Sequence, residues 1–507
     1  MTVAKSSSVS RASTGIPGLD EILNGGLSEH RLHVVEGTAG SGKTTLAFQF
    51  LLEGARRGEN VLFVSFSESE DELRMVADSH GWNLGGSLSI YVPNFAGESA
   101  NPDRDYTIFE PGEVELNEMI KSLHEVIERV NPQRAVFDSV SEMRLLARDP
   151  LRYRRQIIGL KNFFAKRNCT VIFTDEAMPD KDPQLLSIAH GVISLEQNLR
   201  DYGTSQRRLR IQKLRGSEIR EGFHDFVIRH GGLQVFPTLI AAMHQKDFKR
   251  EKYKSGIKGL DSLVDGGLAR GSSTLIAGPA GAGKSSIASA YAVNAAKHNE
   301  RSAFFIFDES KTTLIARAEG FGLKLGELVE SGIVSITQVD PAQFSPGEFS
   351  HLVQEAVEKD GVSLVVIDTL NGYLQSMPNE SSLLLHIHEL LTYLNQQGVV
   401  TLLITAQNGL VGTLESPIDA SYLADAMIAL RYFESSGRVR QAISMIKNRH
   451  GAHERTIREL NLSSRDGIVV GEPITQFEGV LSGQLRYRGE SGDLSAVGVP
   501  ASERRTK

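Results

Sequence analysis

A glycine-rich phosphate-loop pattern occurs twice in the chain and constrains the fold more than any other feature. The pattern G-x-x-x-x-G-K-[ST] is met by GTAGSGKT at residues 37–44 and by GPAGAGKS at residues 278–285. An apolar run precedes each loop and a helical pattern follows it. The backbone N–H groups of such a loop, together with the positive end of the helix dipole, favour a bound phosphate. The sequence therefore predicts two strand–loop–helix units that each bind a nucleotide.

All positions of the two loops are candidate ATP ligands. They are Gly37, Thr38, Ala39, Gly40, Ser41, Gly42, Lys43 and Thr44 in the first copy, and Gly278, Pro279, Ala280, Gly281, Ala282, Gly283, Lys284 and Ser285 in the second. We expect Lys43 and Lys284 to reach the β- and γ-phosphates of ATP. The hydroxyls of Thr44 and Ser285 are the expected ligands of Mg²⁺.

The duplication extends beyond the loops. The phrase TGIPGLDEILNGGL at 14–27 returns as SGIKGLDSLVDGGL at 255–268, and phrase and loop share one offset of 241 residues. Apolar strands alternating with helical patterns follow in both copies, which predicts an α/β fold of two tandem P-loop domains, each a mostly parallel sheet with helices on both faces. We expect the boundaries to be a flexible N-terminus at 1–12, domains at 13–240 and 255–483, a polar linker at 241–254 and a flexible tail at 484–507.

Acidic residues at strand ends complete the candidate sites. Asp138 and Asp368 end apolar strands, where a carboxylate can hold the hydration shell of Mg²⁺. The alternative for these two residues is a turn-forming aspartate. Glu68, and Asp308 with Glu309, follow the strand after each loop helix, where a carboxylate can accept a proton from a water or hydroxyl near the γ-phosphate. The alternative for these three is capping of the next helix.

Composition argues against several other classes of protein. A net charge of −7 over 507 residues argues against a protein that coats nucleic acid. Cys169 is the single cysteine, so no intrachain disulfide is possible, which fits a reducing compartment. The N-terminus lacks the apolar core of a signal peptide and the chain has no run of eighteen apolar residues, so we expect a cytoplasmic protein without a membrane span.

These ordered motifs resemble the KaiC family, the double-domain RecA-superfamily ATPases of the bacterial circadian clock. The likeness covers nearly the whole chain and includes FVSFSES, IQKLRGSE and HGGLQVFP in the first half and FDES, IKNRHG and FEGVLSG in the second. It implies two RecA-like domains in a homohexamer of two stacked rings, with ATP and Mg²⁺ at the subunit interfaces. Lys213 with Arg215, and Lys447 with Arg449, match basic motifs of the family that contact the ATP of a neighbouring subunit.

The resemblance also implies different chemistry in the two domains. The family's catalytic glutamate pair is altered here to Ser67–Glu68 and Asp308–Glu309, so Glu309 is the expected base with Asp308 assisting, and the first domain keeps one carboxylate. The family's second domain phosphorylates itself on an adjacent Ser-Thr pair, which falls here on Ser421 and Tyr422. Ser421 is the expected acceptor, although a serine there is also typical of a turn. Tyr422 departs from threonine, and its hydroxyl projects farther.

The predicted function is that of an ATPase and serine/threonine autokinase that signals its nucleotide and phosphorylation state, in a clock-related or stress-signalling role. KaiB-like proteins, response regulators and histidine kinases are the partner classes that the resemblance implies. The tail after FEGVLSG lacks an apolar helical stripe, which argues against dependence on KaiA. Two alternatives stay open: a nucleic-acid-dependent ATPase like RecA or RadA, for which SVSEMRLLARDPLRYRR offers basic residues, and a nucleotide-gated scaffold with negligible turnover.

Overall fold

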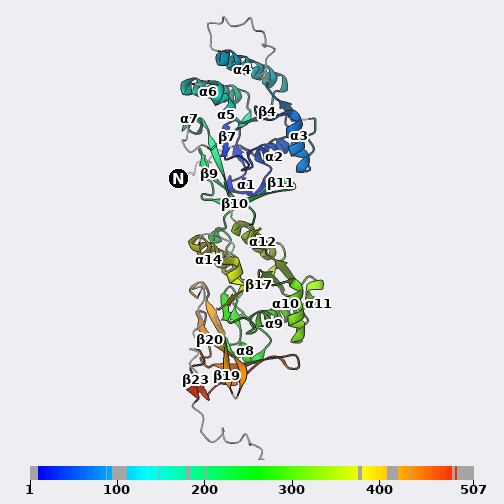
Figure 1. The fold of residues 1–507 in the computed structure, drawn as a ribbon, viewed down its shortest axis with the longest axis vertical. Helices are drawn as coiled ribbons and strands as arrows, with labels where there is room; N and C mark the ends of the chain where they lie inside the picture. Colours follow the sequence, from blue (N-terminus) through cyan, green and yellow to red (C-terminus); the bar gives the residue numbers. More distant parts are fainter. Residues whose placement is uncertain are drawn as a thin grey trace, which may run out of the picture. The chain divides into compact units, whose positions relative to one another are not determined.

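The structure is a computed structural model, drawn as a ribbon in Figure 1. It describes residues 10–86, 88–93, 111–147, 149–177, 183–199, 203–374, 380–407, 421–435, 437–481 and 486–487. Residues 1–9 and most of the 484–507 segment, both expected to belong to flexible ends, lie outside these ranges. The chain divides into two units, Met1–Thr238 and Leu239–Lys507, and each contains one nine-stranded sheet.

The sheet of the first unit has the strand order β11-β10-β9-β8-β3-β7-β6-β4-β5. Its strands are β3 (Leu32–Gly37), β4 (Val61–Ser65), β5 (Leu88–Tyr91), β6 (Arg134–Asp138), β7 (Thr170–Glu176), β8 (Gly191–Asn198), β9 (Gln206–Leu214), β10 (His224–Arg229) and β11 (Gly232–Phe236). Strands β8, β3, β7, β6, β4 and β5 are parallel, and β9, β10 and β11 continue the sheet from β8 as antiparallel strands. The predicted mostly parallel sheet is confirmed.

Helices cover both faces of this sheet. Successive side chains of a strand point to opposite faces, so the two sides of each strand pack against different helices. They are α1 (Pro17–Ile22), α2 (Lys43–Arg56), α3 (Glu70–Ser79), α4 (Pro111–Val130), α5 (Ser141–Ala147), α6 (Pro150–Lys166) and α7 (Pro183–Ile188). Phe63 and Val136 belong to the core beneath α1, α2 and α3, whereas their neighbours Val64 and Phe137 belong to the core beneath α4, α5, α6 and α7. The central strands β3, β4, β6 and β7 are buried along nearly their whole length because each one serves two cores.

The second unit repeats this arrangement with the strand order β16-β15-β17-β18-β14-β19-β20-β21-β22. Its strands are β14 (Ser273–Gly278), β15 (Arg301–Ile306), β16 (Val334–Gln338), β17 (Val362–Asp368), β18 (Val400–Ala406), β19 (Ala426–Ser435), β20 (Arg438–Asn448), β21 (Arg458–Ser463) and β22 (Gly467–Pro473). Its helices are α8 (Lys258–Leu263), α9 (Lys284–Ala296), α10 (Lys311–Gly320), α11 (Leu325–Glu330), α12 (Pro346–Glu358), α13 (Leu370–Leu374) and α14 (Glu380–Gln396). Two cores again lie on opposite faces of the sheet.

The segment expected to be a linker, 241–254, packs on the second unit. The short helix η2 (Ala241–Met243) contributes Ala241 to one of that unit's cores. Strand β12 (Lys252–Tyr253) pairs with β13 (Leu268–Ala269), as β1 (Arg11–Ala12) pairs with β2 (Leu27–Ser28) in the first unit. A further short pair, β23 (Phe477–Glu478) and β24 (Arg486–Tyr487), lies near the C-terminus. The segment 241–254, although polar, therefore contains a short helix and a short strand that pack on the second unit.

The repeated phrase GLDxxxxGG forms the same short helix in both units. Asp20 accepts hydrogen bonds from the backbone N–H and the hydroxyl of Thr14, both at 2.8 Å. Asp261 accepts the same two bonds from Ser255, both at 2.7 Å. The aspartate of the phrase thus fixes the turn that leads into the helix, and the residue four positions before the phrase, Thr14 or Ser255, supplies the hydroxyl for this contact.

The glycines of the phrase permit close backbone contacts. A Cβ at Gly18 would lie 2.1 Å from the carbonyl oxygen of Val235, and a Cβ at Gly259 would lie 2.6 Å from that of Val470. The last glycine, Gly26, has a φ of 126°. In that left-handed region side chains are strongly disfavoured. The glycines of the phrase therefore allow α1 to pack closely against β11, and α8 to pack closely against β22.

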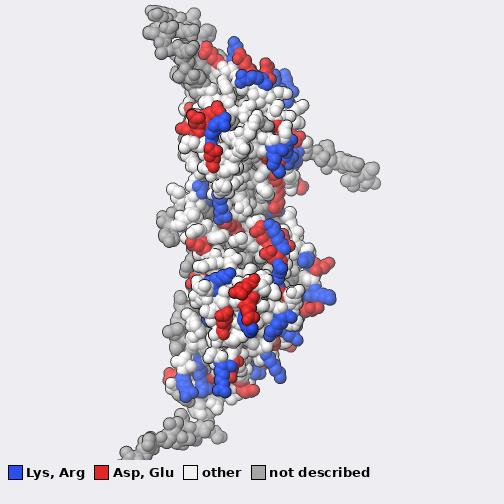
Figure 2. Space-filling view, turned by 90° about the vertical axis from the view of Figure 1, so that its right-hand side faces the viewer, with Lys and Arg blue, Asp and Glu red and all other residues white. Residues whose placement is uncertain are grey.

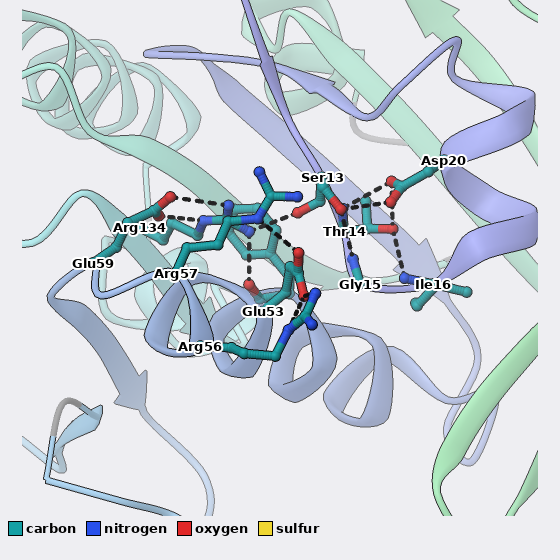
Figure 3. Close-up of polar contacts among 11 residues, drawn as sticks. Ser13, Thr14, Gly15, Ile16, Asp20, Glu53, Arg56, Arg57, Glu59 and Arg134 are labelled. Atoms are coloured by element: carbon teal, nitrogen blue, oxygen red, sulfur yellow. Dashed lines mark hydrogen bonds and ion pairs between the residues drawn. The ribbon is translucent and has the colours of Figure 1, made fainter.

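Figure 3 shows how the start of the first unit is tied to α2 and β6. The Arg134 guanidinium is 2 % exposed and donates to Glu59 Oε2 at 2.5 Å and to the carbonyls of Ser13 at 2.6 Å and Phe50 at 3.0 Å. Next to it, the buried Glu53 carboxylate accepts from Arg56 and Arg57, which lie in the last turn of α2 and directly after it. A buried guanidinium is held well only when its donors are satisfied, and here Arg134 links three segments.

Candidate active sites

The two P-loops connect β3 to α2 and β14 to α9 at the carboxyl edge of each parallel sheet. Their backbones agree: Gly40 and Gly42 have φ values of 74° and 105°, and Gly281 and Gly283 have values of 77° and 95°. Such angles favour glycine over all other residues. The sequence pattern is therefore matched by two copies of one loop conformation, placed where ligands bind in open α/β sheets.

The P-loop lysines are the first residues of α2 and α9 and bond back to their own loops. Lys43 Nζ donates to the carbonyls of Gly37 and Thr38, both at 2.9 Å. Lys284 Nζ donates to the carbonyls of Gly278 and Pro279 at 2.9 and 2.7 Å. Burial lowers the pKa of Lys43 and lowers that of Lys284 to about 8. A phosphate would stabilise the charged form of either lysine, so these ammonium groups are suited to a polyanionic ligand.

The predicted Mg²⁺ ligands are adjacent in the first unit. Thr44 Oγ1 donates to Asp138 Oδ2 at 2.7 Å, and Thr174 donates to the other carboxylate oxygen. In the second unit Asp368 is 4 % exposed, and its Oδ2 has no hydrogen-bond partner among the described residues. Burial raises the pKa of Asp368 to about 6, while the Ser285 hydroxyl acts in the opposite direction. A buried carboxylate oxygen without a donor fits a site for a hydrated Mg²⁺ ion.

The acid predicted as the base of the first unit, Glu68, lies in the turn that follows β4, three residues after Ser65. Ser65 Oγ binds the backbone of Glu68, accepting from its N–H at 3.0 Å and donating to its carbonyl at 2.7 Å, and so fixes the turn. Glu68 Oε2 is buried without a hydrogen-bond partner among the described residues. Burial, followed by the nearby charges of Asp138 and Glu72, raises the pKa of Glu68. Capping of α3 is done by Ser69 with Glu72, so the capping alternative falls on those residues rather than on Glu68.

The corresponding acids of the second unit are both engaged by other side chains. Thr369 donates to Asp308. Arg317 donates to both oxygens of Glu309, from Nη1 to Oε2 at 2.8 Å and from Nη2 to Oε1 at 2.6 Å. Ser310, rather than either acid, caps α10. Arg317 also lines a pocket together with residues 281–286 of the P-loop and the start of α9, so it contacts both the candidate base and the phosphate-binding region.

The four basic residues expected to contact a neighbour's ATP lie at the opposite edge of each sheet from the P-loops. Lys213 pairs with Val192 at the start of β8, and Lys447 pairs with Met427 at the start of β19. Both strands are parallel to the strand that leads into the P-loop. The structure therefore does not bring Lys213, Arg215, Lys447 or Arg449 to the P-loop of its own unit.

Each basic pair instead binds the segment that precedes the neighbouring strand, β8 in the first unit and β19 in the second, in the same way in both units. Lys213 donates to the carbonyl of Leu186 and Arg215 to that of Ser187. Lys447 donates to the carbonyl of Ser421 at 3.0 Å, and Arg449 donates to that of Tyr422 at 3.5 Å. Leu186–Ser187 is thus the counterpart of Ser421–Tyr422 in the first unit. The Tyr422 side chain is half-exposed, and the segment 408–420 before these candidate acceptors lies outside the described residues.

Sequence reasoning did not find Arg317, Thr174 or Thr369. Thr174 and Thr369 are ordinary strand and turn residues, and only their contacts with Asp138 and Asp308 give them a place in the sites. Arg317 lies on the second turn of α10, seven residues after the Ser310 cap, and Val76 takes the same position after the Ser69 cap of the first unit. Alignment of the two repeats would have shown that an arginine in the second unit replaces a valine in the first at this position.

Both units place a P-loop at the carboxyl edge of a parallel sheet, with a strand-end aspartate and a candidate base nearby. This arrangement defines the class of tandem RecA-like P-loop ATPases. A sequence profile described as the KaiC ATPase matches residues 12–240 and 253–474, and the chain belongs to the KaiC ATPase family.

Curated relatives extend this result over nearly the full length. The chain is similar to the circadian clock protein KaiC3 of Synechocystis sp., with 27% identity over 491 residues that cover 95% of this chain and 96% of the relative. It is also similar to the circadian clock oscillator proteins KaiC of Nostoc sp., at 26% identity over 482 residues, and of Synechococcus elongatus, at 25% over 483 residues. Each of these two alignments covers 94% of this chain and 92% of the relative.

Surface charge and helix composition bear on the remaining alternatives. Figure 2 shows Lys and Arg interspersed with Asp and Glu over the face that it presents, without a continuous basic track among the described residues there. The basic stretch that kept a nucleic-acid role open forms α5 and α6, whose inner side chains, including Met143 and Tyr153, are buried in the core. Within the described part of the chain, no helix combines the length and apolar character needed to cross a bilayer.

Proposed function

We propose that this KaiC-family protein is an ATP hydrolase and serine autokinase that works as a homohexamer of two stacked rings. One observation carries the proposal: each sheet has its P-loop, hydroxyl and aspartate at the carboxyl edge and a lysine–arginine pair at the opposite edge. A site divided in this way becomes complete when the carboxyl edge of one copy meets the opposite edge of the next. Repetition of that head-to-tail contact generates a ring.

The residues of both carboxyl edges fit Mg-ATP. Lys43 and Lys284, with the loop backbones, would hold the β- and γ-phosphates. Thr44 with Asp138, and Ser285 with Asp368, would hold Mg²⁺, which neutralises phosphate charge when it is bound. The buried Asp368 oxygen without a hydrogen-bond donor among the described residues supports this assignment.

In the first ring, the proposed reaction is hydrolysis with Glu68 as the base. A water oxygen bonds to the γ-phosphorus, Glu68 accepts the proton of that water, and the bond to the β,γ-bridging oxygen breaks to leave ADP and phosphate. The raised pKa of Glu68, caused first by burial, makes it a better proton acceptor than an exposed carboxylate. Lys213 and Arg215 of a neighbouring copy would stabilise the charge that develops on the phosphoryl group.

In the second ring, the proposed additional reaction is transfer of the γ-phosphoryl group to Ser421. The Ser421 oxygen bonds to the γ-phosphorus, its proton passes to Glu309 with Asp308 assisting, and ADP leaves. Lys447 binds the backbone of Ser421, so the candidate acceptor and the candidate trans cation belong to one copy and approach the same ATP of a neighbour. Tyr422 is the weaker candidate acceptor, because its longer side chain carries the hydroxyl farther from the backbone than threonine does.

The phosphorylated and nucleotide-bound states are the proposed output of the protein. A phosphate on Ser421 adds negative charge beside Lys447 and Arg449, and a change of charge at a subunit contact alters its stability. We propose that signalling proteins read this change, the candidate classes being KaiB-like proteins, response regulators and histidine kinases. Independence from KaiA remains part of the proposal.

Incubation with Mg-ATP followed by native mass spectrometry and phosphosite mapping tests the whole proposal. The expected result is a hexamer with bound nucleotide, release of phosphate, and one added phosphate per chain that disappears in Ser421→Ala. Glu68→Gln and Glu309→Gln should separately lower hydrolysis and autophosphorylation. Hexamers without turnover would favour a nucleotide-gated scaffold, and a monomer that is inactive until single-stranded DNA is added would favour the motor alternative.

A further inference from the structure

A cavity of the first unit lies at the edge of the sheet opposite to the P-loop. Its volume is about 180 Å³, and its lining includes Phe164 and Cys169 on the apolar side and His30, Arg31, Lys161 and His190 on the polar side. Arg31, Cys169 and His190 directly precede β3, β7 and β8, so they gather at the amino ends of three adjacent parallel strands. No carboxylate is among the described residues that line this cavity.

The cationic groups of the cavity repel one another. Burial lowers the pKa of Lys161, and the charges of Arg215 and Arg31 lower it further. Burial and then the charge of Arg31 lower the pKa of His190; a hydrogen bond with the backbone of Arg215 opposes this change, and the charges of Arg215 and Lys161 add smaller effects that lower the pKa. Lys161 Nζ donates to the carbonyl of Ile188 at 2.9 Å, which leaves two of its three donors available. The cluster therefore has positive charge and donors in excess of what the described residues neutralise.

Two ring nitrogens of the cavity residues are also unsatisfied. His190 Nε2 and His30 Nδ1 are buried without a hydrogen-bond partner among the described residues. The other nitrogen of His30, Nε2, lies 3.8 Å from Oε2 of Glu29, which is not among the residues that line the cavity. Buried ring nitrogens are normally paired, and an external acceptor would satisfy them.

The second unit has its own anion at the corresponding position. Gly191 follows His190 and pairs with His33, and Ala426 follows Asp425 and pairs with Thr274, so His190 and Asp425 occupy the same place. Both accept the same backbone bond, from Arg215 N at 3.1 Å and from Arg449 N at 2.9 Å.

The Asp425 carboxylate neutralises the cluster of the second unit. It accepts from Ser273 N at 3.0 Å and lies 3.9 Å from Arg449 and 3.7 Å from His450. The first unit has a histidine in place of this carboxylate and keeps Arg215 at the position of Arg449, and it adds Arg31 where the second unit has Ser272. The second unit thus contains a carboxylate at this position, whereas the first unit does not.

We propose that the cavity of the first unit binds a small phosphate-type oxyanion through Arg31, Lys161 and His190. Ammonium, guanidinium and imidazole N–H groups are the side-chain donors suited to phosphate oxygens. The volume is below the range of about 300–1,000 Å³ that is typical of pockets for larger ligands, so a phosphate group fits and a nucleotide does not. Two sources supply this chemistry, inorganic phosphate and the phosphate of a small monoester. The cavity lies beside Arg215, which the proposed function assigns to a neighbour's ATP, but none of its lining residues belongs to the proposed ATPase sites.

Calorimetric titration of the full chain tests the proposal once both P-loops are filled with saturating Mg-ADP. One arm adds inorganic phosphate, and a second adds glycerol 3-phosphate. The expected result is one binding event per chain in at least one arm. His190→Asp and Lys161→Met should weaken it about tenfold or more, because each removes a cation or adds a carboxylate. Lys166→Met, an exposed substitution on the same helix, should leave the affinity unchanged.

The two arms and the variants separate the possible outcomes. Binding of phosphate identifies the inorganic source, and binding of glycerol 3-phosphate alone identifies the monoester. Binding that persists in the Lys43→Ala, Lys284→Ala double variant places the site outside the P-loops. His190→Asn serves where His190→Asp does not fold, and should also weaken binding. Absence of binding in both arms, or equal affinity in wild type and the His190 variants, would overturn the proposal.

Discussion

Arg317 and Glu309 form a two-point ion pair beside the second P-loop, whereas Val76 stands in the place of Arg317 in the first unit and leaves Glu68 without such a partner. Two loops with the same backbone are thus followed by candidate bases in opposite electrostatic settings. In one the carboxylate is held by a guanidinium, and in the other burial and nearby acids raise the pKa of Glu68. This contrast is a physical basis for different chemistry in the two units.

Replacing Arg317 should weaken Mg-ATP binding at the second site at low pH. Burial raises the pKa of Asp368 to about 6, and Arg317 acts against that rise. In Arg317→Met the pKa of Asp368 therefore goes higher, and less of the carboxylate is ionised for Mg²⁺. We expect a loss of affinity of about threefold to tenfold at pH 6 and little change at pH 8, since one pKa unit corresponds to a factor of ten.

Nucleotide titrations in a Lys43→Ala background isolate the second site for this measurement. Lys311→Met, an exposed change at the start of the same helix, is the control and should leave the affinity unchanged. An equal loss at pH 6 and pH 8 would contradict the role assigned to Asp368 ionisation.

Nucleotide binding at the second site should take up protons above neutral pH. Burial lowers the pKa of Lys284 to about 8, so part of this lysine is neutral in the free protein at pH 8.5. Bound phosphates stabilise the ammonium form and raise that pKa, so binding adds a fraction of a proton at pH 8.5 and almost none at pH 7. Affinity should accordingly fall as the pH rises through 8.

Calorimetry in buffers of different ionisation enthalpy measures this uptake, again in the Lys43→Ala background. Proton uptake that is the same at both pH values would show that Lys284 titrates outside this range.

Gly18→Ala should destabilise the first unit strongly, because its Cβ would lie 2.1 Å from the carbonyl oxygen of Val235. The backbone of β11 or α1 would have to move, and we expect a loss of about 2–4 kcal/mol in the free energy of unfolding of that unit. Gly159→Ala in α6 is the matched control, because its Cβ meets nothing within 4 Å. That substitution should be neutral or stabilising by up to about 1 kcal/mol. Chemical denaturation followed through Trp82, the single tryptophan, reports on the first unit.

The sequence was sufficient to predict the two sheets, the P-loops and the strand-end aspartates, because each follows from local pattern and spacing. The role of the GLDxxxxGG phrase was not predictable in that way. Asp20 and Gly18 act through contacts with Thr14 and with Val235, the second more than 200 positions away. The Arg317–Glu309 pair was missed for a related reason. It depends on where a helix sits against a loop, and a charged residue on a helix ordinarily faces solvent.

Arg134→Met should cost the first unit more than the loss of an exposed ion pair. Arg134 is buried and donates to Glu59 and to the carbonyls of Ser13 and Phe50. Its removal takes these hydrogen bonds away from a buried position and leaves the Glu59 carboxylate without its ion-pair partner, so we expect a destabilisation of about 3–5 kcal/mol. The exposed pair of Arg74 with Glu70 is the control, and Arg74→Met should cost about 0–1 kcal/mol. Limited proteolysis and denaturation of the two variants compare the effects, and similar losses would contradict the bridging role of Arg134.

Mixing two inactive variants should restore autophosphorylation if the second-ring site is shared between copies. Lys284→Ala removes the P-loop lysine at the carboxyl edge, and Arg449→Met removes a cation at the opposite edge, so each variant alone should incorporate almost no phosphate. In an equal mixture, about one quarter of the contacts would pair an intact Lys284 with an intact Arg449. Phosphate incorporation should return to about that fraction of wild type, and the phosphate should lie on the chain that keeps Arg449, because Ser421 lies beside Lys447 on the same edge. Mass spectrometry of isotope-labelled variants identifies the phosphorylated chain. Arg438→Met, at the far end of β20, is the control and should remain active by itself. An Arg449→Met protein that phosphorylates itself at the wild-type rate, or a mixture that stays inactive, would show that the two edges do not form one site.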